Sequence, residues 1–557
     1  MRGMSKKDAL ACQVSLGLFA GLLGIASTAH GAPIADGGGV KEDGVRTGGA
    51  KIVQSGVTTN ITSDNTNNVI GWKDFSVKNG ETVQFDNGAK TNNYLNVVTG
   101  KVTSRIDGSI TGGNNVYIAN TNGVVFGETA SVNVGNLYVT TRQLDADSYI
   151  NNAPDLKDTA TSPLIPVSAT TKAADTSAAA DVVSLIDGSG SLKANKIVLE
   201  GRSVRIMNDA ALQSPTSGGT PEVYALSDQR EFSIPYGGSY NTATKTITGA
   251  STRKLADHKG YVHIGYAGAE PATDGTGKYK NLAPENMYKL VGSAAGTAAV
   301  ADLNDMTDMD GRYMLRGDVD FANAEHTPIG TINKPFKGKF DGMFRTISNM
   351  KLPAGSNTAS TSSSTESYAG LFGNASGAEI MNLGLKEADL SAVIYGGGIV
   401  GSAKDNTRIS AVYNESSKNI GKTTSAQAGG IVGMIESSVI DQAYNAAPIS
   451  KAGGIVGTFK NSALYAVYNT GAIDSPGASY GIYRQIASGP DALIKDAYTA
   501  TGSEVGPDAL INAHAYDSYV FADSSGKKVA NLAANLKTAN LTSNGGAADQ
   551  KEGYASW

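Results

Sequence analysis

The chain has 557 residues, of which 68 are glycine, 7% are aromatic and 17% are charged, and its formal net charge is −5. This composition fits neither a compact helical enzyme nor a highly charged disordered chain, and it favours an elongated β protein with many turns. The net negative charge argues against a broad basic surface, so we expect no nucleic-acid partner.

The N-terminal 31 residues are typical of a secretory signal. Basic residues come first, followed by the apolar run at residues 14–26, which is too short to span a bilayer comfortably, and by the small residues Ala29 and Gly31 before Ala32. We predict that residues 1–31 are removed during secretion. The one cysteine, Cys12, lies within this segment, so the mature chain has to be stable without disulfides.

Residues 50–141 consist of short segments in which apolar and polar residues alternate, separated by turns rich in Asn and Gly. The period of two is typical of β-strands, and residues 118–127 read IANTNGVVFG. The apolar positions of the last segments are Val116, Ile118, Val124, Phe126, Val132, Val134, Leu137 and Val139. We therefore expect a series of short strands with these side chains in the core.

The order of four sequence blocks in this region resembles a known family. The blocks are WKDF at residues 72–75, YLNVVTG at 94–100, IANTNGVVFG at 118–127 and VNVGN at 132–136. They resemble the haemagglutination-activity domain that opens filamentous-haemagglutinin-type exoproteins of two-partner secretion. The resemblance implies export through the periplasm of a Gram-negative-type bacterium, with a dedicated outer-membrane transporter as partner.

One turn carries the most specific part of this resemblance. Asn120, Asn122 and Gly123 match the family motif, whereas Thr121 stands where the family usually has proline. We predict that the turn is retained with a less rigid backbone. By resemblance, Asn120, Asn122 and Gly123 are the candidate export-recognition motif.

Loop-like composition separates the two halves of the chain. Residues 159–180 and 213–222 are rich in Ser, Thr, Ala and Pro, as expected of linkers. Strand alternation returns between them at residues 196–212, which we interpret as one more coil of the first solenoid. The export domain is therefore placed at residues 32–212, followed by a linker and irregular β region at residues 213–300.

The second half contains internal repeats. The sequence GGIVG occurs at residues 397–401, 429–433 and 453–457, and a Tyr-Asn pair follows each copy. Units of roughly 24 to 32 residues cannot bury an apolar face alone, but they can when stacked. We predict that Ile399, Ile431 and Ile455 form the core of successive coils. Asn side chains at equivalent places could form a ladder of hydrogen bonds.

These units resemble GLUG repeats of bacterial surface proteins, and the segment before them resembles the usual lead-in to such repeats. The repeat solenoid is placed at residues 301–500, and a C-terminal segment at residues 501–557. The predicted fold is all-β, a right-handed parallel β-helix in two stacked or linked regions.

The sequence offers little catalytic chemistry. Its mature histidines do not form an H-E-x-x-H pattern, and no cysteine remains as a nucleophile. GASYG at residues 477–481 matches G-x-S-x-G but overlaps a glycine-rich repeat. The acidic run at residues 302–310 lacks EF-hand spacing, and Asp341, Asp389 and Asp441 are scattered. We expect no catalytic residues, no cofactor and no metal, and interpret Arg316-Gly317-Asp318 as part of a strand.

The sequence therefore predicts a non-enzymatic, adhesin-like exoprotein that is secreted or held at the cell surface. One alternative is a structural surface or biofilm-matrix protein, and a less favoured one is a polysaccharide-cleaving enzyme on a β-helix. A retained carboxylate pair in a cleft would favour the enzyme. The receptor, protein or glycan, is not identified by the sequence.

Overall fold

The fold is seen in a computed structural model. It describes residues 33–42, 50–86, 92–141, 182–185, 188–201, 203–227, 232–236, 239–241, 246–248, 251–255, 261–292, 297–304, 306–352, 368–390, 395–420, 427–472, 480–486, 493–499 and 518–520. The predicted signal at residues 1–31, the loop at 159–180 and Ser479 lie outside these ranges.

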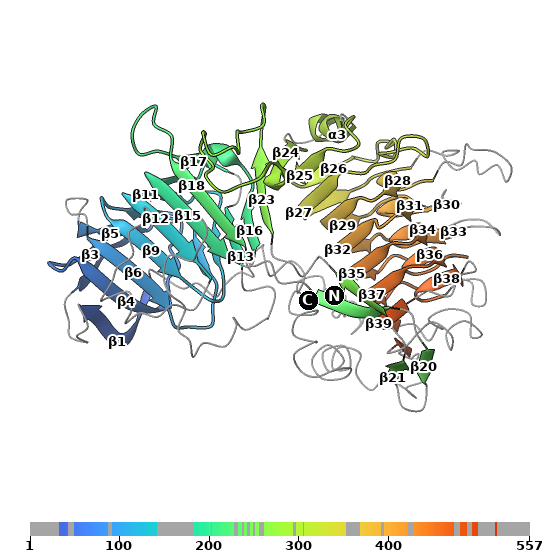
Figure 1. Ribbon diagram of the computed structural model, residues 1–557, viewed down its shortest axis with the longest axis horizontal. Coiled ribbons are helices and arrows are strands. Elements are labelled where there is room, and N and C mark those ends of the chain that lie inside the picture. The colour runs from blue at the N-terminus through green and yellow to red at the C-terminus, as the bar shows by residue number, and fades with distance from the viewer. Residues whose placement is uncertain are drawn as a thin grey trace, which may run out of the picture.

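The described residues form a parallel β-helix, which confirms the predicted all-β solenoid. Figure 1 shows two stacks of strands that meet at an angle near the middle of the chain. No helix in the described ranges is long and apolar enough to cross a membrane.

The first half winds through three sheets, with one strand of each sheet in most coils. The first sheet contains β1 (Ile34–Glu42), β4 (Asn67–Asp74), β6 (Asn93–Val98), β9 (Asn115–Ala119), β12 (Asn136–Thr140), β15 (Lys196–Gly201) and β18 (Glu222–Ser227). The second contains β2 (Lys51–Ser55), β3 (Thr58–Thr62), β5 (Thr82–Phe85), β8 (Ser109–Thr111), β11 (Ser131–Asn133), β14 (Ser191–Lys193) and β17 (Leu212–Gln213). The third begins with β7 (Ser104–Ile106), β10 (Val124–Phe126), β13 (Val182–Leu185) and β16 (Ser203–Ile206).

The alternating pattern sets which side chains enter the solenoid. Val116 on β9 lies beside Leu137 on β12, which lies beside Ile197 on β15, and all three are fully buried in the core. Burying each such aliphatic side chain contributes about 1.5–3 kcal/mol. The coils therefore stack because each one alone leaves this apolar column exposed.

A ladder of asparagine side chains fixes the register of the first sheet. Asn93 Nδ2 donates to Asn67 Oδ1 at 2.7 Å, Asn115 Nδ2 to Asn93 Oδ1 at 2.6 Å, and Asn136 Nδ2 to Asn115 Oδ1 at 2.6 Å. A one-residue slip of any strand would break these bonds and turn its apolar side chains outward.

The third sheet continues into the second half of the chain, and we call it the long sheet. Its further strands are β23 (Val262–Tyr266), β24 (Met287–Val291), β25 (Arg312–Leu315), β27 (Lys339–Ser348) with β26 (Val319–Asp320) at its side, β29 (Glu379–Lys386), β32 (Arg408–Glu415), β35 (Val439–Asn445), β37 (Ala463–Asn469), β39 (Leu493–Thr499) and β40 (Ser518–Val520). Two strands of the long sheet, β23 and β24, therefore lie within residues 213–300, where the sequence predicted a linker and irregular β structure.

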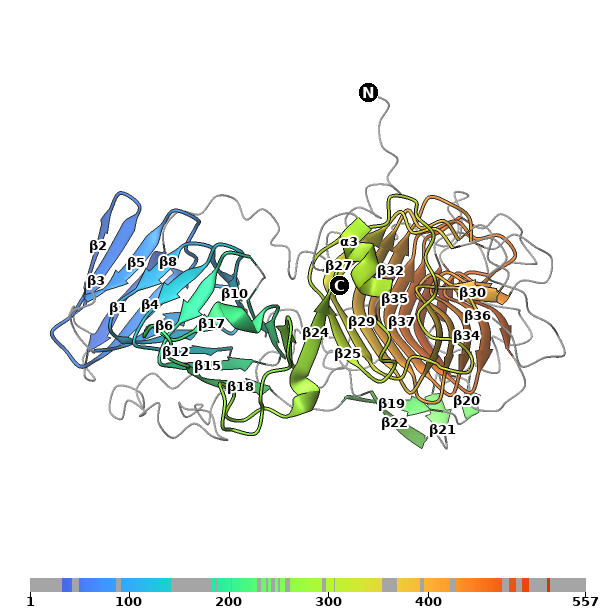
Figure 2. The same ribbon diagram turned by 90° about the horizontal axis from the view of Figure 1, so that it is seen from above.

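The repeats add a second sheet, the repeat sheet, to each coil of the second half (Figure 2). Its strands are β28 (Phe372–Ser376), β31 (Val400–Lys404), β34 (Val432–Glu436), β36 (Val456–Lys460) and β38 (Tyr483–Ile486), with a short pair β30 (Tyr395–Gly397) and β33 (Gln427–Gly429) nearby. The remaining elements are β19 (Phe232–Tyr236) paired with β22 (Ser251–Leu255), β20 (Ser239–Asn241) paired with β21 (Thr246–Thr248), α3 (Thr297–Asn304), η2 (Asp209–Ala211) and η4 (Pro284–Asn286).

The second glycine of GGIVG is needed because two coils approach closely there. A Cβ added at Gly430 would lie 2.0 Å from the carbonyl oxygen of Gly454 and 2.5 Å from Asn445 Cγ. Asn445 belongs to the Tyr-Asn pair, and its Nδ2 donates to Asn469 Oδ1 of the next coil at 2.8 Å. The glycine and the asparagine of each repeat therefore pack against each other.

The Arg316-Gly317-Asp318 tripeptide does not lie in a strand, as the sequence analysis had it, but between β25 and β26. Asp318 is exposed there, and its carboxylate accepts the backbone N–H of Thr346 at 2.7 Å. The tripeptide thus joins two neighbouring coils.

Candidate export-recognition site

The Asn120 turn joins β9 to β10. The N–H of Gly123 donates to the carbonyl oxygen of Asn120 at 3.0 Å, and the Asn120 side-chain oxygen accepts the N–H of Asn122 at 2.8 Å. Gly123 has a φ of +93°, a conformation that residues with a Cβ rarely adopt. These bonds explain locally why the sequence has Asn, Asn and Gly at these three places.

The same turn ties its coil to the coil before it. Asn120 Nδ2 donates to the carbonyl oxygen of Val102 at 2.9 Å and to Ser104 Oγ at 3.0 Å. Asn122 Nδ2 donates to the carbonyl oxygen of Gly100 at 2.9 Å. The side chains of Asn120 and Asn122 therefore hold two successive coils together and also shape the turn.

Burial separates the roles of the two asparagines. The side chain of Asn120 is fully buried, whereas Thr121 and Asn122 are half-buried. A partner protein can reach Asn122 and Thr121 but cannot touch Asn120 in the folded coil. Any effect of Asn120 on recognition is therefore exerted through the shape and stability of the turn.

A buried aspartate at another corner of the same coils, before the strands of the first sheet, was missed by sequence reasoning. Asp86 is 5% exposed, and its carboxylate accepts hydrogen bonds from the N–H of Ser63 at 3.0 Å, Tyr94 Oη at 2.8 Å and Asn114 Nδ2 at 3.0 Å. One carboxylate therefore joins three consecutive coils. Burial, followed by the neighbouring Asp86 carboxylate, raises the pKa of Tyr94, so the phenol keeps its proton. The Asp86-Asn87-Gly88 sequence signals a turn, but not this role.

The predicted repeat residues lie elsewhere. Ile399, Ile431 and Ile455 are each fully buried in the second half, and the N–H of Ile431 donates to the carbonyl oxygen of Ile455 at 3.0 Å. The structure does not bring them near the Asn120 turn. Their part as the core of the repeats and the turn's part in export are therefore separate proposals.

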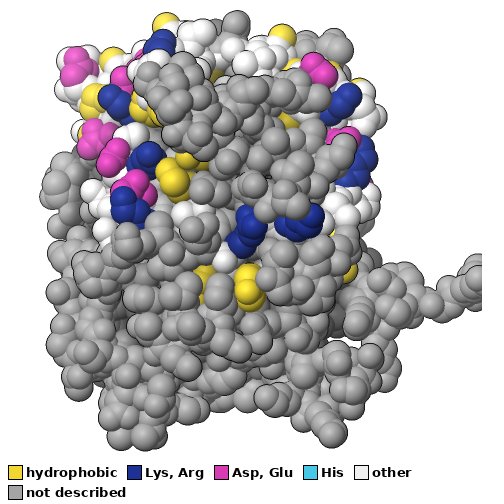
Figure 3. Space-filling model, turned by 90° about the vertical axis from the view of Figure 1, so that its right-hand side faces the viewer, with side chains coloured by type: hydrophobic (Ala, Val, Ile, Leu, Met, Phe, Trp, Pro, Cys, Tyr) yellow, Lys and Arg dark blue, Asp and Glu magenta, His cyan; other side chains and the backbone are white. Residues whose placement is uncertain are grey.

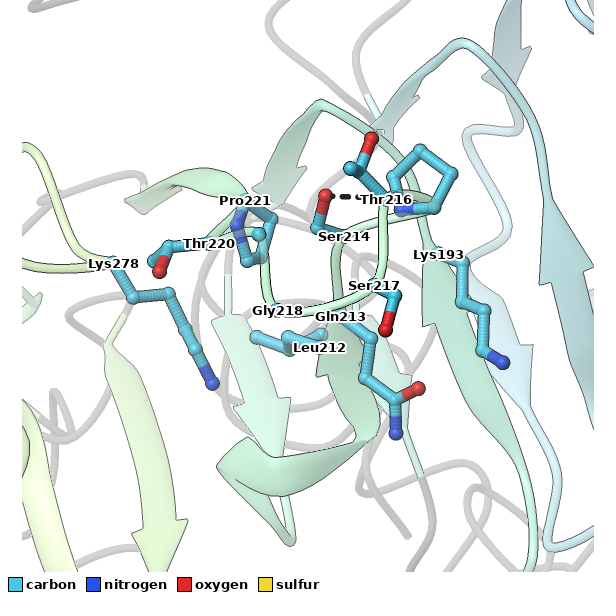
Figure 4. A pocket seen from close by; sticks show the side chains of 12 residues that line it. Lys193, Leu212, Gln213, Ser214, Thr216, Ser217, Gly218, Thr220, Pro221 and Lys278 are labelled. Carbon is cyan, nitrogen blue, oxygen red and sulfur yellow. Dashed lines mark hydrogen bonds between the residues drawn. The ribbon is translucent and has the colours of Figure 1, made fainter.

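A surface cavity of about 520 Å³ lies at the loop after β17 (Figure 4). Hydroxyl groups and glycines of residues 214–220 line it, with Lys193 and Lys278 on either side. Lys278 Nζ already donates to the backbone oxygen of Asp209 at 2.8 Å and pairs with its carboxylate at 3.2 Å. Since no carboxylate lines this cavity, it has no acid–base pair for cleaving a glycan.

The scattered carboxylates also do not assemble into a site. Asp341 and Asp441 are fully buried, and Asp389 pairs with Lys418 at 3.1 Å. Within the described part of the chain, no three His, Cys, Asp or Glu side chains are placed to hold a metal ion.

The outer surface of the repeats carries opposite charges on neighbouring coils. Lys339 pairs with Glu379 at 2.8 Å, and Lys404 and Lys460 both pair with Glu436 from the coils on either side. In the space-filling view of this end of the molecule, basic and acidic side chains lie next to one another (Figure 3). Exposed pairs of this kind contribute about 0–1 kcal/mol each, so they favour register more than stability.

The stacked coils, the Asn120 turn and the buried Asp86 carboxylate define a parallel β-helix whose first coils are held together by polar side-chain contacts at their turns. Residues 32–278 match the family described as the TPS secretion domain, and this part of the chain belongs to that family. The match identifies the first part of the chain as a two-partner secretion domain. The match runs past residue 212, where the sequence analysis placed the end of the first domain.

Two curated relatives are similar over a short stretch. The heme/hemopexin-binding protein of Haemophilus influenzae strain Rd is 35% identical over 83 residues, which is 15% of this chain and 9% of that protein. A second Haemophilus influenzae heme/hemopexin-binding protein is 34% identical over 84 residues, again 15% of this chain and 9% of the relative. The match thus spans less than a tenth of either relative.

Among solved structures, the HMW1 secretion domain from Haemophilus influenzae was matched over 87% of this chain and 98% of its own, with 13% identity and a TM-score of 0.25.

Proposed function

We propose that this protein is an adhesin-like exoprotein whose first solenoid addresses it to a dedicated outer-membrane transporter and whose second solenoid acts outside the cell. The observation that carries the proposal is the TPS secretion domain at residues 32–278, directly continued by the repeat coils through one long sheet. In this arrangement a secretion domain is joined to a second solenoid, which presents polar and charged side chains on its outer surface.

Folding outside the cell can supply the driving force for export. Each coil that stacks buries apolar side chains such as Val116 and Leu137 and forms the hydrogen bonds between coils at the next turn. A chain segment that has stacked outside opposes backsliding, so no ATP is needed in the periplasm. Growth from the N-terminal coils onward makes the first turns the decisive ones.

Substitutions in the Asn120 turn test the part of the proposal that concerns export. Replacing Asn120 and Asn122 together with alanine removes the side-chain hydrogen bonds of the turn, including those to the carbonyl oxygens of Val102 and Gly100, at a cost of about 0.5–1.5 kcal/mol per bond. In cells that contain the transporter, we expect the mature double variant to accumulate in the periplasm. Undiminished secretion would contradict the assignment.

Asn115→Ala is the matched control. It removes two rungs of the asparagine ladder, to Asn93 and to Asn136, and leaves the turn intact. If it blocks secretion as strongly as the double variant, the defect is one of general stability. A turn-specific role requires that Asn115→Ala be secreted at a similar loss of stability in the isolated domain.

The adhesin half is tested by comparing binding with cell retention. Purified mature protein and a shortened form that ends at residue 278 are applied to host cells and to immobilised glycans. We expect binding that depends on the second solenoid. Retention on washed producing cells with no binding to host cells or glycans would favour the alternative, a structural surface or biofilm-matrix protein.

A further inference from the structure

The long sheet bends where the two halves meet (Figures 1 and 2). In a flat sheet β23 and β27, three positions apart, would be separated by about 14 Å. Instead, His263 Nδ1 on β23 lies 2.7 Å from Asp341 Oδ2 on β27. Both side chains point away from the solenoid interior, because their neighbours Val262 and Phe340 belong to the two hydrophobic cores.

Asp341 is the centre of the contacts across this bend of the long sheet. Besides facing His263, its carboxylate accepts the N–H of Met343 at 2.8 Å and Nδ2 of Asn382 on β29 at 2.9 Å. On the other side of the imidazole, Tyr288 Oη lies 2.9 Å from His263 Nε2. Asp341 is fully buried and His263 is 5% exposed, so water does not screen this chain of hydrogen bonds.

Arg205 on β16 supplies the opposite charge. Arg205 is 6% exposed, its guanidinium lies over the rings of Tyr261 at 5.1 Å and of Phe344 at 4.6 Å, and its Nε donates to Tyr261 Oη. Asn382 reaches the same hydroxyl at 3.4 Å. Groups from β16 and β23 are thus interlocked with groups from β27 and β29, and buried Met207, Leu290, Met314 and Met343 surround them.

We propose that Arg205, Tyr261, His263, Tyr288, Asp341 and Asn382 form a clasp that fixes the angle between the two halves of the rod and loosens in acid. The clasp joins segments more than a hundred residues apart, such as Arg205 and Phe344. It therefore closes only after both the export domain and the first coils of the second half have folded.

The acid response follows from the protonation states of the groups that form the clasp. Burial lowers the pKa of His263 in spite of the Asp341 carboxylate, so the imidazole is neutral, donates to Asp341 and accepts from Tyr288. Burial alone would raise the pKa of Asp341, but the bond from His263 and the charge of Arg205 hold it below its ordinary value. Protonating His263 places a second positive charge beside Arg205 and removes the acceptor of the Tyr288 hydroxyl.

The other charged groups around the clasp come from β25, β27 and β29. Glu379 favours the charged form of His263, Lys339 opposes it, and these two also pair with each other at 2.8 Å. Arg312 acts on Tyr288, and Arg345 reaches Met207 Sδ at 3.9 Å. Since the folded pKa of His263 is depressed, its contribution is complete above about pH 6.5 and is lost as the pH falls below that value.

Two spin labels measure the angle directly. The mature chain contains no cysteine, so Ser131→Cys at an exposed position of β11 and Asn333→Cys at an exposed position of the second half give one label in each half. We expect a narrow distance distribution at about pH 7.5 and a broader, shifted one at about pH 5, while the circular dichroism of the strands is unchanged. The labelled full-length mature protein is used throughout.

Asp341→Asn in the same labelled chain removes the charge that Arg205 and His263 face, and we expect the broad distribution already at about pH 7.5. His326→Phe is the control, since His326 is the other histidine of the described ranges and lies outside the clasp; it should respond to pH as the parent does. The clasp is refuted if the parent distribution is unchanged at about pH 5, if it changes only together with loss of the β signal, or if a folded Asp341→Asn variant keeps the narrow distribution. If Asp341→Asn does not fold, the parent's pH series decides.

Discussion

Replacing Ile431 with aspartate should break the repeat solenoid, and the cost can be worked from its position. Ile431 is fully buried, so truncation to alanine alone costs about 2–5 kcal/mol. A carboxyl group there has no hydrogen-bond partner and must be protonated to stay inside. Starting from an ordinary pKa of about 3.9, holding it neutral at pH 7 costs about 4 kcal/mol more, at about 1.36 kcal/mol per pH unit. The sum is comparable with the whole stability of a domain, about 5–15 kcal/mol.

The assay is limited proteolysis of the mature protein, with Ile431→Ala as the matched variant. At pH 7 we expect Ile431→Asp to expose the repeats to digestion while a fragment that begins near residue 32 survives. Because the TPS secretion domain match and strand β23 extend past residue 212, the fragment should end nearer residue 278. Near pH 4 the difference between the two variants should shrink, since the carboxyl group is then protonated at little cost. Equal protease resistance of Ile431→Asp and the parent at pH 7 would refute the buried register.

Three further predictions concern single positions. Thr121→Pro should raise the stability of the isolated export domain by about 0.4–1 kcal/mol, because position two of this turn suits proline; a lower melting temperature would show that the turn does not accept it. Burial lowers the pKa of His326 to about 4, in spite of its bond to the carbonyl oxygen of Leu371. The free energy of unfolding of the second half should therefore fall by about 3 kcal/mol as the pH falls from about 6.5 to 4. His326→Phe should flatten this part of a stability-versus-pH curve measured by urea unfolding. Gly430→Ala should destabilise the repeats by about 2–3 kcal/mol in the same urea titration, because the added methyl overlaps the next coil and Asn445, and an unchanged midpoint would contradict this packing.

The sequence was informative where one residue pattern decides the structure. Alternation identified the strands, and the repeated GGIVG identified the coils of the second half, because a buried face and a close backbone approach each require particular residue types. The Asn120 turn was found through a resemblance, and its hydrogen bonds agree with what such a turn needs.

The features that the sequence did not indicate depend on contacts between distant segments. In three repeat strands of the long sheet, β29, β32 and β35, one non-glycine residue with positive φ interrupts the strand pairing, namely Asn382 at +55°, Ala411 at +49° and Gln442 at +55°. Ala411 and Gln442 have no local preference for that conformation, so the stacking of neighbouring coils must impose it. Asp86 and Asp341 are likewise ordinary acidic residues in sequence, and only the fold surrounds them with donors.

The long sheet has a mechanical consequence. Its strands lie across the rod, so the backbone hydrogen bonds between coils run along the rod's length. When one end is anchored and the other is pulled, the coils detach one row at a time, like a zipper, and each needs only a small force. A coil of 24 residues, as between Val439 and Ala463, lengthens from about 5 Å to about 80 Å when it detaches. A tether built in this way yields stepwise under flow and recoils when the tension drops.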